Sequence, residues 1–179
     1  MIIAIDLSLR STGLTCISNS GELLDFEIVT SKKEEYDNEE LLLYNASNVC
    51  RFISNCELNL NESINGIAIE GLSFGGIGGK KDVLQGNFWV LLTHLKTYFN
   101  DIPVGKIPVL SWRSKVLSKE EQREAKKTKD GLKKAVIDKL PADVNPRFEK
   151  YLEETKLPKK CLADLADSYF LGQYRLSLG

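Results

Sequence analysis

The chain has 179 residues, of which 42% are hydrophobic and 27% are charged. This balance excludes an intrinsically disordered protein, and the length suits one globular domain covering residues 1–179. No run of about 18 apolar residues occurs, which excludes a membrane-spanning helix. The apolar N-terminus lacks the basic segment and cleavage site of a secretory signal, so we expect a cytoplasmic protein.

The formal net charge of −1 hides an uneven distribution of charge along the chain. Residues 31–65 hold three basic and seven acidic side chains, whereas residues 104–134 hold ten basic and four acidic ones. A segment with such an excess of Lys and Arg can follow a phosphate backbone. A solvated helix face rich in Lys and Glu has the same composition, so charge alone leaves both interpretations open.

The four cysteines do not form a recognisable metal or disulfide pattern. They are Cys16, Cys50, Cys56 and Cys161, and their separations of 34, 6 and 105 residues fit neither a zinc site nor a disulfide framework. Each has apolar neighbours in the sequence, so we expect reduced thiols with a structural role.

The first 30 residues predict an antiparallel meander. Residues 2–7 form an apolar strand, residues 10–13 resemble a turn in which Gly13 can adopt a positive φ, and residues 14–18 alternate as a second strand. The Asn-Ser-Gly turn at 19–21 leads into a third strand over residues 23–29.

The next segment alternates between helix and strand. Asp37 and Glu40 have the spacing of a capping box ahead of a long helix, whose apolar side chains recur at steps of three and four through Cys56. A short apolar strand at residues 67–70 follows. After a glycine-rich loop, Asp82 is expected to cap a second helix over residues 82–99.

The last third of the chain is mostly helical. A strand at residues 104–110 contains a proline and should lie near a sheet edge. Ser118 and Glu121 are spaced to cap a basic helix, an apolar stripe covers residues 132–140, and residues 141–158 read as a connection with a helical turn around 148–152. The final helix covers residues 158–178. This order predicts an α/β fold with a mixed sheet and helices on its faces.

Four acidic residues stand out by their positions. Asp6 and Glu70 end two apolar strands that should neighbour each other, and the carboxyl ends of such strands are where open α/β sheets bind ligands. Asp164 and Asp167 lie one turn apart on the same helix face, where two negative charges repel each other. Each alone is more typical of a turn cap or a solvated face. Together they predict a site for Mg²⁺ or Mn²⁺, which prefer oxygen ligands.

The motifs that hold these acids resemble those of the RuvC family of Holliday junction resolvases, in the ribonuclease H-like superfamily. Residues 3–13 (IAIDLSLRSTG) are similar to the family's opening strand and turn, and residues 67–70 (IAIE) to its second carboxylate strand. The helix with Leu84-Gln85-Gly86 follows in the expected place, and residues 162–168 (LADLADS) resemble the closing acidic helix. Leu7-Ser8 replaces the Pro-Gly common after the first Asp, and the loop after Glu70 is richer in glycine, as in a divergent branch such as a viral one.

The resemblance implies a ribonuclease H-like fold: a five-stranded mixed sheet, built from a three-stranded antiparallel meander and parallel strands, flanked by helices. It also implies a homodimer formed through the helix at 82–99, and resolution of four-way DNA junctions by paired symmetric nicks that leave 5′-phosphate and 3′-hydroxyl ends. By carry-over, two Mg²⁺ ions, for which Mn²⁺ can substitute, would be held by Asp6, Glu70, Asp164 and Asp167.

Contacts to DNA are expected from an aromatic residue on the glycine-rich loop and from basic side chains. Phe74 is equally suited to stacking on an unpaired base and to packing beneath its loop. The candidate DNA-binding residues are Phe74, Lys80, Lys81, Arg113, Lys115, Lys126, Lys127, Lys129 and Lys133. One lysine near residues 129–133 is expected to approach the scissile phosphate. His94, the one histidine, has apolar neighbours and is expected to be a structural or interface residue.

Three alternatives stay open at this point. The first is a YqgF-like RNA-processing nuclease of the same superfamily, and the second is a non-catalytic protein that binds DNA junctions. The third is a sugar or acetate kinase, because residues 6–13 also resemble the phosphate hairpin of actin-like kinases; such a fold needs two domains of this kind and about twice the length.

Overall fold

The computed structural model describes residues 1–31, 37–60, 62–71 and 80–179. The strands are β1 (Ile2–Asp6), β2 (Ser11–Ile17), β3 (Leu23–Thr30), β4 (Gly66–Gly71) and β5 (Val104–Pro108). The helices are α1 (Asn38–Leu60), α2 (Lys80–Tyr98), α3 (Val109–Val116), α4 (Lys119–Ala125), α5 (Gly131–Ile137), α6 (Asn145–Glu154) and α7 (Cys161–Ser177).

The strands form one mixed sheet in the order β3-β2-β1-β4-β5. β1 pairs antiparallel with β2 and parallel with β4, and β4 pairs parallel with β5. The prediction of an antiparallel meander joined to parallel strands is therefore confirmed. β5 is an edge strand, as its proline indicates, because proline has no backbone N–H to donate to a neighbouring strand.

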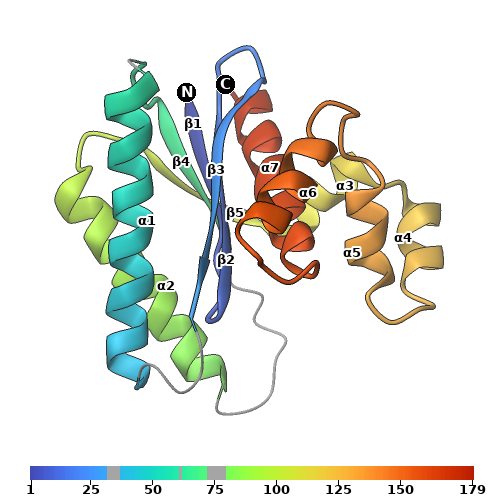
Figure 1. The fold of residues 1–179 in the computed structure, drawn as a ribbon, viewed down its shortest axis with the longest axis horizontal. Coiled ribbons are helices and arrows are strands. Elements are labelled where there is room, and N and C mark those ends of the chain that lie inside the picture. Colours follow the sequence, from blue (N-terminus) through green and yellow to red (C-terminus); the bar gives the residue numbers. More distant parts are fainter. Residues whose placement is uncertain (32–36, 61, 72–79) are drawn as a thin grey trace.

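Helices cover both faces of the sheet (Figure 1). α1 and α2 lie together on one face, and α7 lies on the other, where it packs against β1 and β2. α3, α5 and α6 pack around α7, and α4 packs against α5. The basic segment thus lies on the α7 side of the molecule.

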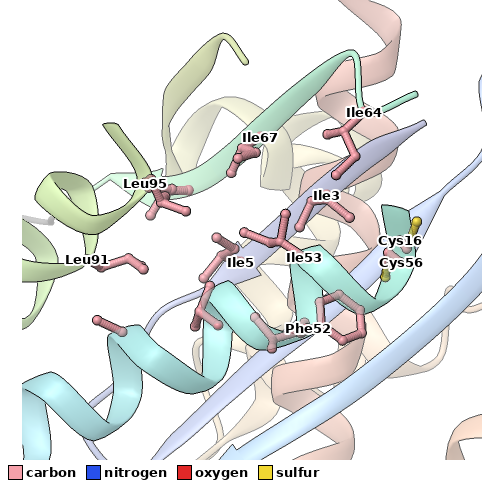
Figure 2. Packing of buried hydrophobic residues seen from close by; sticks show 14 of the residues in the cluster. Ile3, Ile5, Cys16, Phe52, Ile53, Cys56, Ile64, Ile67, Leu91 and Leu95 are labelled. Atoms are coloured by element: carbon pink, nitrogen blue, oxygen red, sulfur yellow. The ribbon is translucent and has the colours of Figure 1, made fainter. Parts of the chain in front are cut away.

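The packing of α1 follows from its sequence pattern. The backbone N–H of Glu40 donates to Asp37 Oδ1 (2.9 Å), and the backbone N–H of Asp37 donates to Glu40 Oε2 (3.3 Å), which confirms the capping box. The apolar face of the helix then buries Ile53 in one cluster with Ile3 and Ile5 of the central strand (Figure 2). This cluster fixes β1, and with it the position of the residue that ends β1.

The cysteines lie in apolar surroundings as free thiols, three of them buried and Cys50 half-buried. Cys16 and Cys56 belong to the cluster between the sheet and α1 (Figure 2), where the Cys16 thiol lies 3.2 Å from the Met1 sulfur. Burial raises the pKa of the Cys50 thiol to about 11, so this side chain stays protonated at neutral pH.

Several predicted boundaries were wrong. β2 begins at Ser11, so residues 11–13 are strand rather than turn, and Gly13 is not among the described residues with a positive φ. α2 begins at Lys80, so Asp82 lies in the first turn, where its negative charge interacts favourably with the positive end of the helix dipole, and not at the cap. The predicted strand over residues 104–110 ends at Pro108, and residues 109–116 form α3.

The later helices agree better with their sequence signals. The capping box at Ser118 and Glu121 is present at the start of α4. α6 is longer than the single turn expected around residues 148–152, and α7 begins three residues later than predicted. None of the described helices has the length and apolarity needed to cross a membrane.

Candidate active site

Two carboxylates meet where the central parallel strands end. Asp6 is the last residue of β1, and Glu70 is the penultimate residue of β4. The register pairs Ile5 with Ile69, so the next residue of each strand lies beside the other at the same sheet edge. The predicted convergence of the two strand-terminal acids is confirmed.

The third carboxylate comes from α7, which approaches the sheet unusually closely. A Cβ atom on Gly13 would lie 2.1 Å from the carbonyl oxygen of Asp164, and one on Gly172 would lie 2.5 Å from Ile17 Cδ1. A larger residue at either position would push the helix away from the sheet. The role of Gly13 is therefore to make room for α7, which carries Asp164 and Asp167 to the strand ends.

Three of the four predicted acids form one cluster. Asp6, Glu70 and Asp167 each offer a carboxylate oxygen, and these oxygens lie within 4.8 Å of one another. Asp164 is outside this set, one helical turn away, and its carboxylate is engaged by other side chains. The structure thus distinguishes the two aspartates of α7, which sequence spacing had treated alike.

Burial and mutual repulsion make these carboxylates hard to ionise. Burial raises the pKa of Asp6 well above its ordinary value, and the nearby charges of Glu70 and Asp167 raise it further. Burial raises the pKa of Asp167 to about 7, although Arg113 opposes the shift. Burial also raises the pKa of Glu70, which shares a hydrogen bond with Asp6. At neutral pH the cluster needs a proton or a cation to be stable.

Two basic residues predicted to bind DNA lie beside the acids. Arg113 of α3 donates from Nη2 to Asp167 Oδ2 at 3.4 Å, and its guanidinium lies over the ring of Trp112. Lys133 of α5 places Nζ 3.7 Å from Asp164 Oδ1. Sequence reasoning listed both residues among nine candidate DNA contacts and expected one lysine near residues 129–133 to approach the scissile phosphate. It could not single out Arg113, because α3 was not predicted.

The other candidate contacts are more peripheral or outside the described residues. Lys115, Lys126, Lys127 and Lys129 are solvent-exposed, and Lys127 is paired with Glu124. Phe74 and the side chains of Lys80 and Lys81 lie outside the described residues. His94 is half-buried on α2, with Nδ1 2.9 Å from the carbonyl oxygen of Val90, and it does not belong to the acidic cluster.

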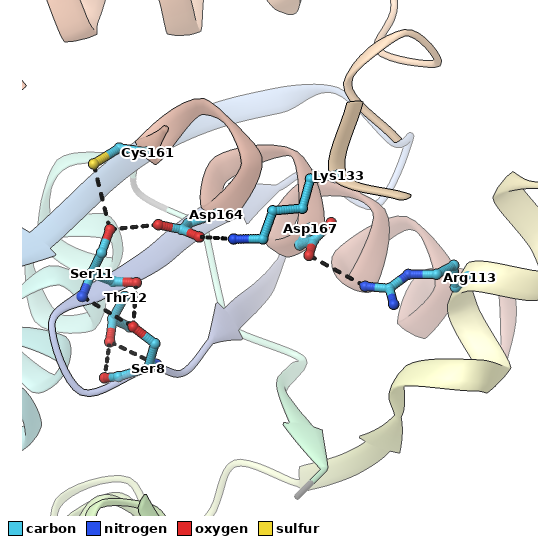
Figure 3. A network of polar contacts seen from close by, with 8 residues as sticks. All are labelled: Ser8, Ser11, Thr12, Arg113, Lys133, Cys161, Asp164 and Asp167. Carbon is cyan, nitrogen blue, oxygen red and sulfur yellow. Dashed lines mark hydrogen bonds and ion pairs between the residues drawn. The ribbon is translucent and has the colours of Figure 1, made fainter. Parts of the chain in front are cut away.

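A network of hydrogen bonds holds the loop that follows Asp6 (Figure 3). Thr12 Oγ1 donates to the Ser8 carbonyl (3.0 Å), Ser8 Oγ donates to the Ser11 carbonyl (2.8 Å), and Ser11 Oγ donates to Asp164 Oδ2. This chain of contacts links the end of β1 to α7. Sequence analysis assigned Ser8 and Ser11 only a place in the motif.

Two buried asparagines attach the same loop to the opposite helical layer. Asn87 of α2 donates from Nδ2 to the Ser8 carbonyl at 3.0 Å, and Asn45 of α1 donates to the Leu9 carbonyl at 3.3 Å. Asn45 also donates to Asn87 Oδ1. Sequence reasoning missed both residues. An amide on an otherwise apolar helix face is the signal that could have found Asn45, since buried polar side chains need partners.

The cluster has the chemistry of a site for a hard divalent cation. All three side chains offer carboxylate oxygens, the ligand type that Mg²⁺ and Mn²⁺ prefer. Asp167 Oδ1 is buried and has no hydrogen-bond partner among the described residues. Such an atom is costly unless it binds something, and a cation next to three crowded carboxylates would satisfy it. The residues therefore fit a divalent ion.

Comparison with known proteins identifies the architecture. No family model matches the sequence, and no curated protein sequence matches it either. Among solved structures, Thermus thermophilus RuvC in complex with a Holliday junction substrate matches with a TM-score of 0.64 and 16% identity, covering 99% of this chain and 95% of that one. The chain has a RuvC-like fold.

Two further structures agree with this assignment. A second structure of Thermus thermophilus RuvC has a TM-score of 0.61 at 14% identity, over 99% of this chain and 96% of the other. The mitochondrial Holliday junction resolvase of yeast has a TM-score of 0.53 at 13% identity, over 99% of this chain and 80% of the other. The RuvC-like fold thus spans nearly the whole chain and confirms the architecture that the motifs predicted.

Proposed function

We propose that this protein is a metal-dependent endonuclease that resolves four-way DNA junctions. The observation that carries the proposal is the cluster of Asp6, Glu70 and Asp167, with carboxylate oxygens within 4.8 Å of one another in a RuvC-like fold. One of the similar structures is described as a complex with a Holliday junction substrate, which favours a branched DNA as the substrate here.

The three clustered carboxylates would hold Mg²⁺, or Mn²⁺ in its place, with Asp164 as a fourth ligand for a second ion. A bound divalent cation supplies Lewis-acid activation of water and stabilises charge at the phosphate. Arg113 keeps Asp167 oriented through the contact at Oδ2, which leaves Oδ1 for the ion. The expected products carry 5′-phosphate and 3′-hydroxyl ends.

The basic residues beside the acids would bind the DNA backbone. Lys133 is 53% exposed, so its ammonium group can reach a phosphate next to the cluster. The exposed lysines Lys115, Lys126, Lys127 and Lys129 extend this positive surface over α3 and the α4–α5 hairpin. Phe74, Lys80 and Lys81 remain candidate contacts on the evidence of the sequence alone.

A homodimer formed through α2 would present two sites to the two symmetry-related strands of a junction. Trp89 supports an interface on α2, because this residue is 56% exposed on a helix that otherwise packs against α1. A large exposed aromatic residue is a frequent anchor of protein interfaces. The partner in this proposal is a second copy of the chain.

The test is cleavage of a labelled synthetic four-way junction, with Mg²⁺ and with EDTA, read on a denaturing gel. We expect paired symmetric nicks that need the metal and that Asp6→Asn abolishes, while junction binding is kept. Asp138→Asn, an exposed acid at the end of α5, is the matched control and should cut normally.

The outcomes separate the alternatives. Cleavage by Asp6→Asn at the wild-type rate would refute the assigned site. Junction binding without cleavage in any divalent metal would favour a non-catalytic junction-binding protein. Equal cutting of RNA and branched DNA would favour a YqgF-like RNA-processing nuclease.

A further inference from the structure

The two aspartates of α7 differ in what their carboxylate oxygens contact. Asp167 has one oxygen on Arg113, and its other oxygen is buried without a hydrogen-bond partner in the part of the chain that the structure describes. Asp164 has both oxygens facing donors: Oδ2 accepts from Ser11 Oγ, and Oδ1 faces Lys133 Nζ at 3.7 Å. One aspartate is therefore ready to bind a cation, and the other is already occupied.

The two donors hold Asp164 with unequal strength (Figure 3). Ser11 is fixed by its own backbone, because its N–H donates to Ser8 Oγ at 3.0 Å and its carbonyl accepts from the same hydroxyl. The side chain of Lys133 is 53% exposed, whereas that of Asp164 is only 14% exposed. Solvent screens an ion pair with such an exposed partner, so Lys133 can be drawn away while Ser11 stays in place.

A second negative charge close to the cluster would compete for Lys133. A DNA phosphate is such a group: lysine is a compact cation on a flexible stem, suited to phosphate, and Lys133 reaches the cluster from its solvent side. When the lysine moves to the phosphate, Asp164 keeps the Ser11 contact but regains one unpaired oxygen. The same carboxylate then faces the cluster with a free lone pair.

We propose that Asp164 is a gated metal ligand. In the free protein Ser11 and Lys133 hold it apart, and Asp6, Glu70 and Asp167 take up one divalent ion. A second ion binds through Asp164 only after a DNA phosphate has drawn Lys133 away. This inference rests on the proposed function and adds an order of assembly: substrate binding and loading of the second ion favour each other, as linkage requires.

The test is to count the Mn²⁺ ions that the DNA-free protein binds. Titration calorimetry and the loss of the free-ion electron paramagnetic resonance signal both measure this number. Wild type is expected to bind one ion tightly and a second at least about tenfold more weakly. Lys133→Met is expected to strengthen the second ion about tenfold, because it removes a positive charge next to Asp164. Lys134→Met, an exposed neighbour on the same helix, is the matched control and should leave both ions unchanged.

Removing the aspartate shows whether the second ion uses it. Lys133→Met combined with Asp164→Asn is expected to lose the second ion and keep the first. A double-mutant cycle on junction binding in EDTA provides an independent readout. There Asp164→Asn should tighten binding several-fold in the presence of Lys133, and much less in the Lys133→Met background.

The results distinguish this inference from the proposed function. Two ions of equal affinity in the free wild-type protein, or a second ion insensitive to Lys133→Met, would overturn the gate and leave the nuclease proposal intact. No divalent ion bound to the wild-type protein would overturn both.

Discussion

Asp167→Asn tests whether the acidic cluster destabilises the fold when no metal is present. The pKa of Asp167 is about 7 in the folded protein, against an ordinary value of 3.8, and burial is the main cause. Between these two values the folded state keeps a proton that the unfolded state has released. Stability therefore falls as pH rises through this window, the reverse of the usual effect of a paired carboxylate.

The size of the effect follows from the two pKa values. For one group with these values, raising the pH from 5 to 8 costs about 3 kcal/mol of unfolding free energy. In a chain of 179 residues this corresponds to a fall in Tm of about 6–12 °C. Asp6 and Glu70 have raised pKa values as well, so the wild-type loss is at least of this order.

Thermal unfolding in EDTA at the two pH values measures the loss. Asp167→Asn cannot ionise and keeps an oxygen for Arg113, so the share of the fall that Asp167 contributes, about 3 kcal/mol, should disappear and the variant should be more stable than wild type at pH 8. Asp138→Asn, with an exposed carboxylate, should keep the wild-type pH profile. If Asp167→Asn loses as much stability between pH 5 and pH 8 as wild type does, Asp167 is not a source of the loss and the reasoning from its pKa fails.

Three further predictions concern the packing, the loop network and the proposed dimer. Gly13→Ala should destabilise the protein by about 1–3 kcal/mol in urea unfolding and weaken metal binding, because its Cβ would lie 2.1 Å from the Asp164 carbonyl oxygen; an unchanged unfolding midpoint would contradict the close approach of α7. Asn87→Ala should lower the free energy of unfolding by about 1–3 kcal/mol, because it leaves buried polar groups unpaired. In the double variant, Asn45→Ala should lower it further by less than Asn45→Ala does alone, and fully additive effects would contradict the coupling between the two amides. Trp89→Ala should shift a dimer toward monomer in analytical ultracentrifugation with little change in Tm, and an unaltered association constant would remove α2 from the interface.

The parts of the fold that the sequence predicts well are those with a local physical signal. The capping box of α1 and the 3–4 spacing of its apolar residues define that helix, and alternation with a Asn-Ser-Gly turn defines the β2–β3 hairpin. Asp6 and Glu70 were predictable as neighbours because parallel strands bring their carboxyl ends to one edge. In each case the signal lies within a few residues of the feature.

The parts that were missed depend on contacts distant in sequence. Residues 109–116 carry no helix cap, and Pro108 is equally consistent with an edge strand, so α3 and the position of Arg113 could not be predicted. Gly13 looked like a turn residue because its neighbours are polar. Its role is set by Asp164, about 150 residues further along the chain, whose backbone occupies the space where a Cβ would lie.

The distinction between Asp164 and Asp167 shows why spacing alone could not define the site. Both lie on one helix face, and the coincidence of this pair with the two strand-terminal acids was the basis for predicting a shared metal centre. Their surroundings make the two aspartates different. Arg113 contacts one oxygen of Asp167 and the other, buried oxygen has no partner among residues 1–31, 37–60, 62–71 and 80–179, whereas Ser11 and Lys133 each face one oxygen of Asp164. An unpaired buried carboxylate oxygen raises the free energy of the metal-free protein, so binding a cation there lowers the free energy. In the proposed metal site, an oxygen that must first give up a lysine would bind a cation less readily. We therefore expect the partners of the two aspartates, and not their positions on the helix, to set the order in which they bind metal.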